Sequence, residues 1–216
     1  MSRVTLVEVG MRDGLQNEKE NLSVDQRIEF AERLVKAGLR RIEGGAFVSP
    51  QKVPQMADSK LVIQKLRAGQ ESGTISGKVT FSALVPNMHG YKEARESDVK
   101  EIAVFGAVSE TFSQKNINCT VAESFERFRE VIAAARKDRI RVRGYVSTVF
   151  GCPYEGKIKA SKALKVLEKY FELGVYELSI GDTIGVATPL QVRELLAPLK
   201  KMKLIDRVAM HFHDTR

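Results

Sequence analysis

Residues 160–182, ASKALKVLEKYFELGVYELSIGD, contain a predicted helix followed directly by a predicted strand. From Ala160 to Leu173 the apolar residues recur every three or four positions, which is the spacing of an amphipathic helix, and Gly174 is suited to end it. The next segment, Tyr176–Ile180, has the length and apolar character of a strand. A helix that leads into an apolar strand is the repeating unit of a parallel β/α fold.

The same alternation extends outward from this unit. Seven segments are predicted to be strands: Val4–Val9, Arg41–Phe47, Val79–Val85, Glu101–Ala107, Ile140–Ser147, Tyr176–Ile180 and Val208–His213. Most are near-continuous apolar runs, which are typical of strands buried on both faces of a parallel sheet. The predicted helices are Val24–Ala37, Met56–Leu66, Lys92–Asp98, Ser124–Lys137, Ala160–Leu173 and Pro189–Lys201.

Two architectures have this alternation, the open doubly wound sheet and the (β/α)8 barrel. No GxGxxG motif follows the first strand, and nearly every strand ends in polar residues, among them Arg12-Asp13, Asp182-Thr183 and the pair His211 and His213. Polar residues at the carboxyl ends of many strands are what an active site in a barrel requires. We therefore predict an α/β fold, a (β/α)8 TIM barrel, as a single domain over residues 1–216.

Only seven of the eight strands of such a barrel are recognised, and the sequence ends directly after the seventh. We expect a domain that is C-terminally incomplete, because unpaired strand edges expose backbone donors and acceptors and promote aggregation. Either the natural chain continues beyond Arg216 with a further strand, or another subunit covers the edges.

The charge balance indicates an anionic partner. Lys and Arg number 35 against 27 Asp and Glu, which gives a net charge of +8. The basic residues are scattered over the helical segments and Trp is absent, so nucleic acid is not expected, although a merely solvated basic surface is an alternative. Membrane spans and a secretory signal are not recognised, and Cys119 and Cys152 cannot form a disulfide framework. We expect a cytoplasmic protein without a membrane partner.

His211 and His213 are the sharpest local feature. Residues i and i+2 of a strand point to the same side, so the two imidazoles project together at the carboxyl end of the last predicted strand. Neutral imidazole is a common ligand of divalent transition metals. The alternative is a pair of polar residues whose hydrogen bonds are made by water or backbone.

Acidic residues follow or interrupt three other strands. Asp13 can bring a hard oxygen ligand, and Arg12 can neutralise charge that develops on a substrate oxygen, although the two can equally form an ion pair in a loop. Glu43 lies inside an apolar strand and must pair there, most simply with Arg12. Asp182 is expected at the same end, with a helix-capping role as the alternative. Cys152 precedes a proline, and we interpret it as structural.

Several motifs together resemble the 3-hydroxy-3-methylglutaryl-CoA lyase family, a branch of the metal-dependent TIM-barrel lyases and synthases. They are RDGLQNE at 12–18, FVSP at 47–50, KNINC at 115–119, RGYVS at 143–147, GCPYEG at 151–156, GDTIG at 181–185 and HFHDT at 211–215. The RDG and HxH motifs place only the superfamily, whereas the others point to the lyase branch. The resemblance runs from about residue 4 to residue 216.

The resemblance implies a role for each matching residue. Asp13, His211 and His213 would bind the metal, Arg12 would stabilise the enolate, and Glu43 and Asp182 would be acidic residues of the active site. Gln16, Arg143, Tyr145, Ser179 and Thr183 would contact substrate, and Lys19, Lys115 and Asn116 would contact CoA. It also implies a divalent cation (Mg²⁺ or Mn²⁺, with Zn²⁺ or Co²⁺ as alternatives), an acyl-CoA substrate, a homodimer, and a place in leucine degradation and ketone body metabolism.

Two departures from the family pattern affect these expectations. Gly44, Gly45 and Ala46 stand where the family usually has hydroxyl side chains, so we expect a pocket with fewer donors and a change in substrate choice or efficiency. The family's glycine-rich catalytic loop, its reactive cysteine, an asparagine ligand and its last strand would lie beyond position 216. The alternatives are a catalytically incompetent barrel fragment that binds metal or CoA, and a condensing synthase of the same superfamily.

Overall fold

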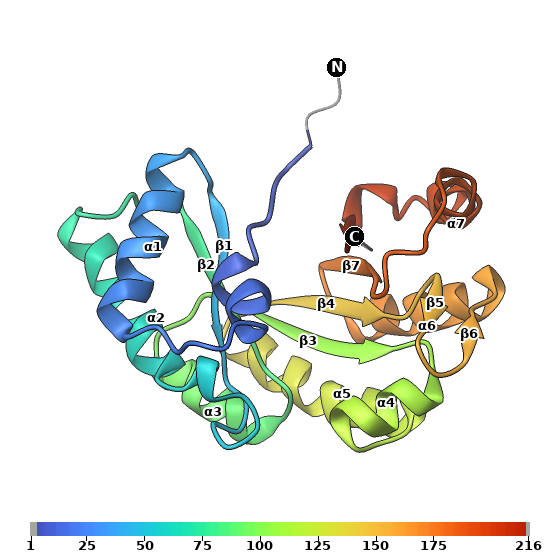
Figure 1. Ribbon diagram of the computed structural model, residues 1–216, viewed down its shortest axis with the longest axis horizontal. Coiled ribbons are helices and arrows are strands. Elements are labelled where there is room, and N and C mark those ends of the chain that lie inside the picture. Colours follow the sequence, from blue (N-terminus) through green and yellow to red (C-terminus); the bar gives the residue numbers. More distant parts are fainter. Residues whose placement is uncertain (1–3, 215–216) are drawn as a thin grey trace. The chain divides into compact units, whose positions relative to one another are not determined.

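The computed structural model describes residues 4–214 (Figure 1). The chain divides into two compact units, with the boundary between Ala103 and Val104, and each unit is described by itself. The prediction of a single domain stays a prediction. Within the described residues, none of the helices combines the length and apolar character needed to cross a membrane. Thr215, in the last of the sequence motifs, and the chain end at Arg216 lie outside the described residues.

The first unit contains parallel strands with helices packed on them. Its elements are the π-helical turn η1 (Gly10–Gly14), α1 (Val24–Lys36), β1 (Arg41–Ala46), the 3-10 turn η2 (Pro54–Met56), α2 (Ser59–Ser72), β2 (Thr80–Leu84), α3 (Met88–Glu96) and the start of β3 (Glu101–Ala107). β2 pairs in parallel with β1 on one side and β3 on the other. The two helices α1 and α2 pack against each other, and α2 contacts β1.

The second unit repeats this construction. Its elements after β3 are α4 (Glu110–Ile117), α5 (Val121–Lys137), β4 (Arg141–Ser147), β5 (Gly151–Cys152), β6 (Gly156–Lys157), α6 (Ala160–Leu173), β7 (Glu177–Asp182), α7 (Pro189–Lys201), the 3-10 turn η3 (Ile205–Arg207) and β8 (Val208–Phe212). β4, β7 and β8 are parallel neighbours, and β5 with β6 forms a short antiparallel hairpin. α5 packs on β4 and α6 on β7.

Local sequence signals account for the helix ends that were predicted well. The helices predicted at 24–37, 160–173 and 189–201 are α1, α6 and α7, each within one residue of the prediction. Ser23 and Thr188 each form a capping box with the residue three positions later, so two backbone groups at each helix start are paired. Gly38 and Gly174 follow the ends of α1 and α6 with φ near +99°, a conformation that glycine adopts without steric cost.

The predicted first strand, 4–9, is reduced to a single parallel bridge between Glu8 and Ile42. Glu8 donates its N–H to the carbonyl of Arg41 and accepts the N–H of Glu43, at 2.9 and 2.8 Å. The side chains of Val4 and Leu6 are 87% and 69% exposed, so this segment buries too little apolar surface to stabilise a longer strand in the first unit.

Helix prediction was less accurate for four other helices. The helix predicted at 124–137 is α5, which begins three residues earlier at a capping box of Thr120 and Glu123. The helices predicted at 56–66 and 92–98 are displaced, to α2 and α3. α4 was not predicted, because it has only eight mostly polar residues and a single buried side chain, that of Ser113.

Candidate active site

Arg12 and Asp13 lie in the π-helical turn η1, at the end of the segment that bridges to β1. The N–H groups of Arg12, Asp13 and Gly14 all point to the carbonyl of Val9, at 3.0, 2.6 and 3.5 Å, and the bond from Gly14, five residues on, is the one typical of a π-helix. Turns of this type occur frequently at functional sites. The predicted polar residues after the first strand therefore lie in a helical turn instead of an irregular loop.

The Arg12 guanidinium contacts two carboxylates. Its Nε donates to Oε2 of Glu43 at 2.6 Å, and its Nη1 donates to Oδ1 of Asp13, also at 2.6 Å. Arg12 is 7% exposed and Glu43 is completely buried. The partner predicted for Glu43 is thus present in the structure, and the charge-assisted hydrogen bonds hold the planar guanidinium in one orientation.

The second carboxylate oxygen of Glu43 is not bonded to Arg12. This atom, Oε1, is buried and has no hydrogen-bond partner among the described residues. A buried carboxylate oxygen without a donor is costly, and a bound water, an ion or a ligand is one way to satisfy it. Gln16 was predicted to contact substrate and Lys19 to contact CoA. Both side chains are exposed and follow the turn η1 in the sequence.

The two glycines that follow Glu43 face the helices instead of a substrate pocket. The register shifts between Glu43 and Gly45, so Gly44 is the extra residue of a β-bulge. A Cβ on Gly44 would contact the side chains of Ile63 and Leu66 in α2, and one on Gly45 would meet α1 and α2. At positions 44 and 45 the missing side chains would therefore face the helices, so no hydroxyl is lost from the pocket there. The expected loss of a hydroxyl at Ala46 stays a prediction.

In the second unit, the register of β4, β7 and β8 places several predicted site residues on one face of these strands. Tyr145 lies opposite Ser179, which lies opposite Ala209, two residues before His211. Because side chains alternate along a strand, Arg143, Tyr145, Ser179 and the two histidines share one face. The opposite face carries the buried residues that pack on the helices, such as Leu178 and Ile180.

Arg143 is held by its neighbours on that face. Its Nε donates to Oε1 of Glu177 at 2.5 Å, and its Nη1 donates to the hydroxyl of Tyr145 at 3.0 Å. Arg143 is 2% exposed and Tyr145 is 8% exposed. The hydrogen bond from Arg143 therefore helps to fix the position of the Tyr145 hydroxyl on this face.

The imidazoles of His211 and His213 lie together, with ring centroids 4.7 Å apart and planes at 87°. Nδ1 of His213 lies 2.8 Å from the carbonyl oxygen of Thr183. A carbonyl can only accept, so Nδ1 carries the proton and the lone pair is on Nε2, the atom that a metal would bind. The geometry fits the predicted metal-binding pair within this unit.

Thr183 and Asp182 organise the loop after β7. The Thr183 hydroxyl accepts the N–H of Thr148 at 2.7 Å, which ties this loop to the end of β4. Asp182 is 2% exposed, and its two oxygens accept the N–H groups of Val186 and Ala187 at 3.0 and 2.9 Å. By the alternation, Asp182 lies on the face opposite Ser179. It binds the loop before α7 and does not cap that helix, whose N-cap is Thr188. Its catalytic role stays a prediction.

The KNINC and GCPYEG motifs contact each other. Lys115, on the exposed side of α4, places Nζ 4.3 Å from the ring centroid of Tyr154. Glu155 accepts hydrogen bonds from the Thr111 N–H at 2.8 Å and the Ser109 hydroxyl at 2.7 Å, at the start of α4. Burial opposes ionisation of Glu155, but these hydrogen bonds outweigh it and lower its pKa to about 2.

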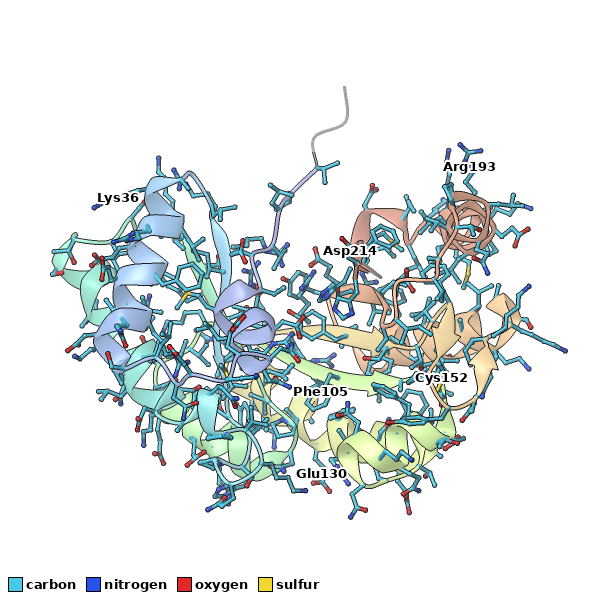
Figure 2. The ribbon with its side chains drawn as sticks, in the orientation of Figure 1. Lys36, Phe105, Glu130, Cys152, Arg193 and Asp214 are labelled. Carbon is cyan, nitrogen blue, oxygen red and sulfur yellow. The ribbon has the colours of Figure 1, made fainter. Side chains whose placement is uncertain are left out.

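Cys152, labelled in Figure 2, lies in β5 and is 2% exposed. Its Sγ is 3.0 Å from the Ser109 hydroxyl and accepts the N–H of Tyr154 at 3.4 Å. A buried thiol in hydrogen bonds of this kind has little reactivity. The structure therefore agrees with the interpretation of Cys152 as structural.

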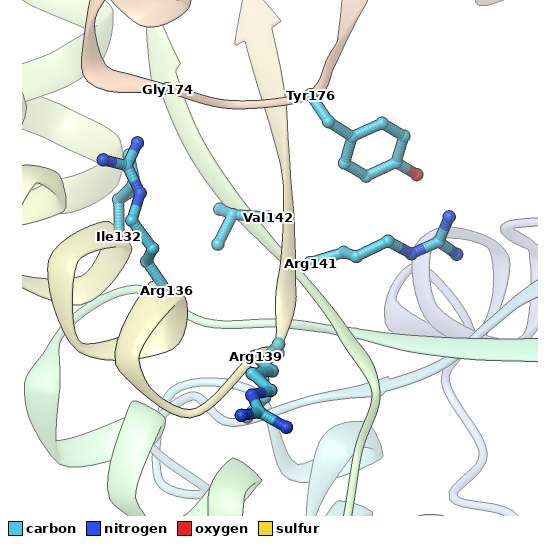
Figure 3. Close-up of a pocket in the computed structure, with 8 residues that line it drawn as sticks. Ile132, Arg136, Arg139, Arg141, Val142, Gly174 and Tyr176 are labelled. Carbon is cyan, nitrogen blue, oxygen red and sulfur yellow. The ribbon is translucent and has the colours of Figure 1, made fainter.

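A cavity of about 270 Å³ in the second unit lies at the other end of the strands (Figure 3). It is lined by Ile132, Arg136, Arg139, Ile140, Arg141, Val142, Gly174 and Tyr176. These residues flank the amino-terminal ends of β4 and β7, whereas the predicted residues lie toward the carboxyl ends. None of the predicted site residues lines this cavity, so it is not the candidate active site.

Comparison with known proteins agrees with the resemblance seen in the motifs. Residues 3–216 match the HMGL-like protein family. The chain is 49% identical over 213 residues to the 3-hydroxy-3-isohexenylglutaryl-CoA/hydroxy-methylglutaryl-CoA lyase of Pseudomonas aeruginosa, and the match covers 99% of this chain and 69% of that relative.

Solved structures give the same result. A hydroxymethylglutaryl-CoA lyase from Pseudomonas aeruginosa matches with a TM-score of 0.90 and 47% identity, over 99% of this chain and 69% of that one. An HMG-CoA lyase from Acinetobacter baumannii, solved with coenzyme A and 3-methylmalate, matches with a TM-score of 0.88 and 32% identity, over 100% and 70% of the two chains.

The chain therefore belongs to the HMGL-like family and is an enzyme of the HMG-CoA lyase type. The predicted fold class, an α/β TIM-barrel fold, is confirmed by the similarity to the lyase structures. The chain spans about two thirds of the length of these relatives.

Two residues that hold candidate site segments in place were not recognised from the sequence. Glu177 lies two residues before Ser179 on the same strand face and pairs with Arg143 of β4. That pairing depends on the register of the two strands, which the sequence alone does not give. Glu155 was part of a recognised motif, yet its target at the start of α4 is 44 residues away from it along the chain. Neither partner can be found from local spacing.

We predict that Glu155→Gln removes an acid-sensitive part of the stability. The folded chain holds the pKa of Glu155 at about 2, below the ordinary value of 4.5, so its ionised carboxylate stabilises the fold above about pH 4.5. That contribution is lost as the pH falls toward 2. The melting-temperature difference between the parent and Glu155→Gln should therefore shrink from pH 6 to pH 3. A difference that is constant with pH would contradict the assignment.

Proposed function

We propose that this protein is a divalent-metal-dependent carbon–carbon lyase that cleaves 3-hydroxy-3-methylglutaryl-CoA to acetyl-CoA and acetoacetate. The observation that carries the proposal is the buried guanidinium of Arg12, held between the carboxylates of Glu43 and Asp13. This arrangement suits the stabilisation of an oxyanion that forms during the reaction. The similarity to named HMG-CoA lyases supports the choice of substrate.

His211 and His213 would hold the metal, and we propose that Asp13 supplies a carboxylate oxygen to the same ion. The paired rings and the Nε2 lone pair of His213 fit a divalent cation of borderline softness. Two imidazoles favour Mn²⁺ or another transition ion, whereas Mg²⁺ prefers oxygen ligands. When bound, such an ion lowers the pKa of a coordinated hydroxyl group.

The chain's own groups would then move the proton and receive the charge. A base, either Asp13 or His211, removes the proton of the tertiary hydroxyl, and the C–O bond becomes the ketone of acetoacetate. The electron pair of the broken C–C bond passes to the thioester as an enolate, whose oxygen Arg12 stabilises. Protonation of the enolate carbon gives acetyl-CoA; the family pattern draws this proton from the catalytic loop beyond position 216, and Cys119 and Cys152 are both buried.

The remaining predicted residues would bind and orient substrate. We propose that Tyr145, Ser179 and Arg143 contact it from the sheet face, and that Thr183 positions His213. Gln16 would contact it from the turn after Asp13. Lys19, Lys115 and Asn116 would bind the phosphates and adenosine of CoA, in agreement with the net charge of +8. A cytoplasmic location and a homodimer stay predictions from the sequence.

A cleavage assay distinguishes the proposed lyase from two other functions. A condensing synthase would consume acetyl-CoA and a 2-oxo acid, and an incompetent fragment would bind metal or CoA without cleavage. The assay measures acetoacetate and acetyl-CoA from 3-hydroxy-3-methylglutaryl-CoA. Since one relative is named for an isohexenyl analogue as well, that thioester is a second substrate to test.

We expect removal of metal with a chelator to abolish cleavage and Mn²⁺ or Mg²⁺ to restore it. His211→Ala and His213→Ala should each weaken Mn²⁺ binding by about 10-fold or more, measured by calorimetry. His89→Ala is the matched control, because this third histidine is exposed near the start of α3, and it should bind as the parent does. Equal affinity in all three variants would exclude the proposed ligands.

We expect Arg12→Lys to lower kcat by about 100-fold and to leave KM nearly unchanged. Lysine keeps the charge but loses the planar fork that bonds to both carboxylates. Arg33→Lys is the control, because Arg33 is exposed and pairs only with Glu29 on its own helix. A large rise in KM at normal kcat would instead make Arg12 a substrate-binding residue.

We expect Lys115→Ala to weaken binding of CoA esters, and added salt to weaken it further, because a surface phosphate contact is screened. Lys169→Ala, an exposed lysine of α6 paired with Glu172, serves as the control. The affinity for a truncated pantetheine thioester should not change in either variant. If the parent binds the full ester and the truncated ester equally well, phosphate recognition by Lys115 is refuted.

A further inference from the structure

The register of β1 against β2 shifts between Glu43 and Gly45. Two backbone groups beside this bulge form hydrogen bonds with side chains: the carbonyl of Gly44 and the N–H of Ala46. Hydrogen bonds to buried backbone groups matter because leaving such a group unsatisfied is costly. One of these side chains comes from α1 and the other from α2.

Arg27 of α1 serves the carbonyl. It is 1% exposed, and its Nη2 donates to the Gly44 oxygen at 3.1 Å while its Nη1 donates to the Ala57 oxygen at 2.8 Å. Burial lowers the pKa of Arg27, and the charge of Asp58 opposes that change. Burying a guanidinium costs free energy that hydrogen bonds must offset. Nη1 and Nη2 of Arg27 form such bonds, whereas its Nε has no hydrogen-bond partner among the described residues.

Ser59 of α2 serves the N–H. Its hydroxyl accepts the N–H of Ala46 at 3.1 Å and donates to the carbonyl of Met56 at 2.7 Å. Nη2 of Arg27 lies 3.4 Å from the same hydroxyl oxygen. The two side chains therefore form one buried polar cluster against the bulge.

Gly45 makes room for this cluster. A Cβ at position 45 would lie 2.6 Å from the Ser59 Oγ, 3.0 Å from the Ser59 Cβ and 3.0 Å from Nη2 of Arg27. Contacts below 3.0 Å force atoms to move, and both neighbours are tied by hydrogen bonds. The glycine that departs from the family pattern is thus explained by what α1 and α2 place behind it.

We propose that Arg27 is a positioning residue that acts through the bulge on Glu43 and Arg12, and that Gly45 is required because Arg27 and Ser59 fill the space of its side chain. The Gly44 carbonyl held by Arg27 belongs to the residue directly after Glu43, and Glu43 fixes Arg12 at 2.6 Å. The catalytic part of this inference rests on the proposed role of Arg12.

The test removes the donors of Arg27 and observes Arg12. Arg27→Met keeps the length of the stem and loses every hydrogen bond, whereas Arg27→Lys keeps one charged donor. We expect Arg27→Met to shift the NMR resonance of the Arg12 Nε–H group, assigned by its loss in Arg12→Lys. We also expect kcat to fall about 10-fold with KM within about 2-fold, and Arg27→Lys to recover part of kcat.

A second pair of variants keeps the test decisive if Arg27→Met does not fold. Gly45→Ala should shift the same resonance and lower the melting temperature. In a Ser59→Gly background, which removes the two closest contacts, Gly45→Ala should lower it by less. Gly77→Ala is the control, because a Cβ there meets nothing within 4 Å.

Three outcomes decide the inference. A folded Arg27→Met with the parent's resonance and kcat would make Arg27 merely structural and overturn the positioning role. An equal cost of Gly45→Ala in both backgrounds would overturn the steric requirement. If the parent shows no cleavage, the proposed function fails, and the resonance and melting measurements still decide the inference separately.

Discussion

The alternation of side chains along parallel strands is the constraint on which the candidate site depends. In β4, β7 and β8 the register aligns odd-numbered residues, so Tyr145, Ser179 and His211 share one face while Leu178 and Ile180 face the helices. A shift of one residue would exchange these two sets and bury the polar groups against α5 and α6. The packing of the apolar side chains on the helices thus determines which residues lie on the opposite, polar face.

The bulge in β1 is the exception to this alternation, and it has a structural consequence of its own. It turns Gly44 and Gly45 together toward α1 and α2 and interrupts the pairing of the strand. Beside the bulge, the helices supply polar groups to the strand: Arg27 donates to the Gly44 carbonyl and Ser59 accepts the Ala46 N–H. Glu43, the last residue before the bulge, keeps its carboxylate on Arg12.

Two buried arginines of the candidate site form ion pairs. Arg12 and Arg143 are both nearly inaccessible, and each bonds to a carboxylate within 2.6 Å. Removing one partner of such a pair typically costs about 3–5 kcal/mol, because the other charge stays buried without compensation. Only the Glu43 Oε1 lacks a partner among the described carboxylates in the core, and it adjoins the proposed catalytic arginine.

The sequence by itself determined the β/α alternation, the ends of α1, α6 and α7, and the identity of the polar residues at strand ends, because these depend on local periodicity, caps and spacing. It also indicated the Arg12–Glu43 pair, since a buried carboxylate needs a cation nearby. Only the tertiary structure decided that Asp182 binds the loop before α7, that Glu177 and Glu155 are partners of distant segments, and that Gly44 and Gly45 face helices. The physical reason is that each of these depends on strand register or on a bulge, and both are set by contacts between residues that are far apart in the chain.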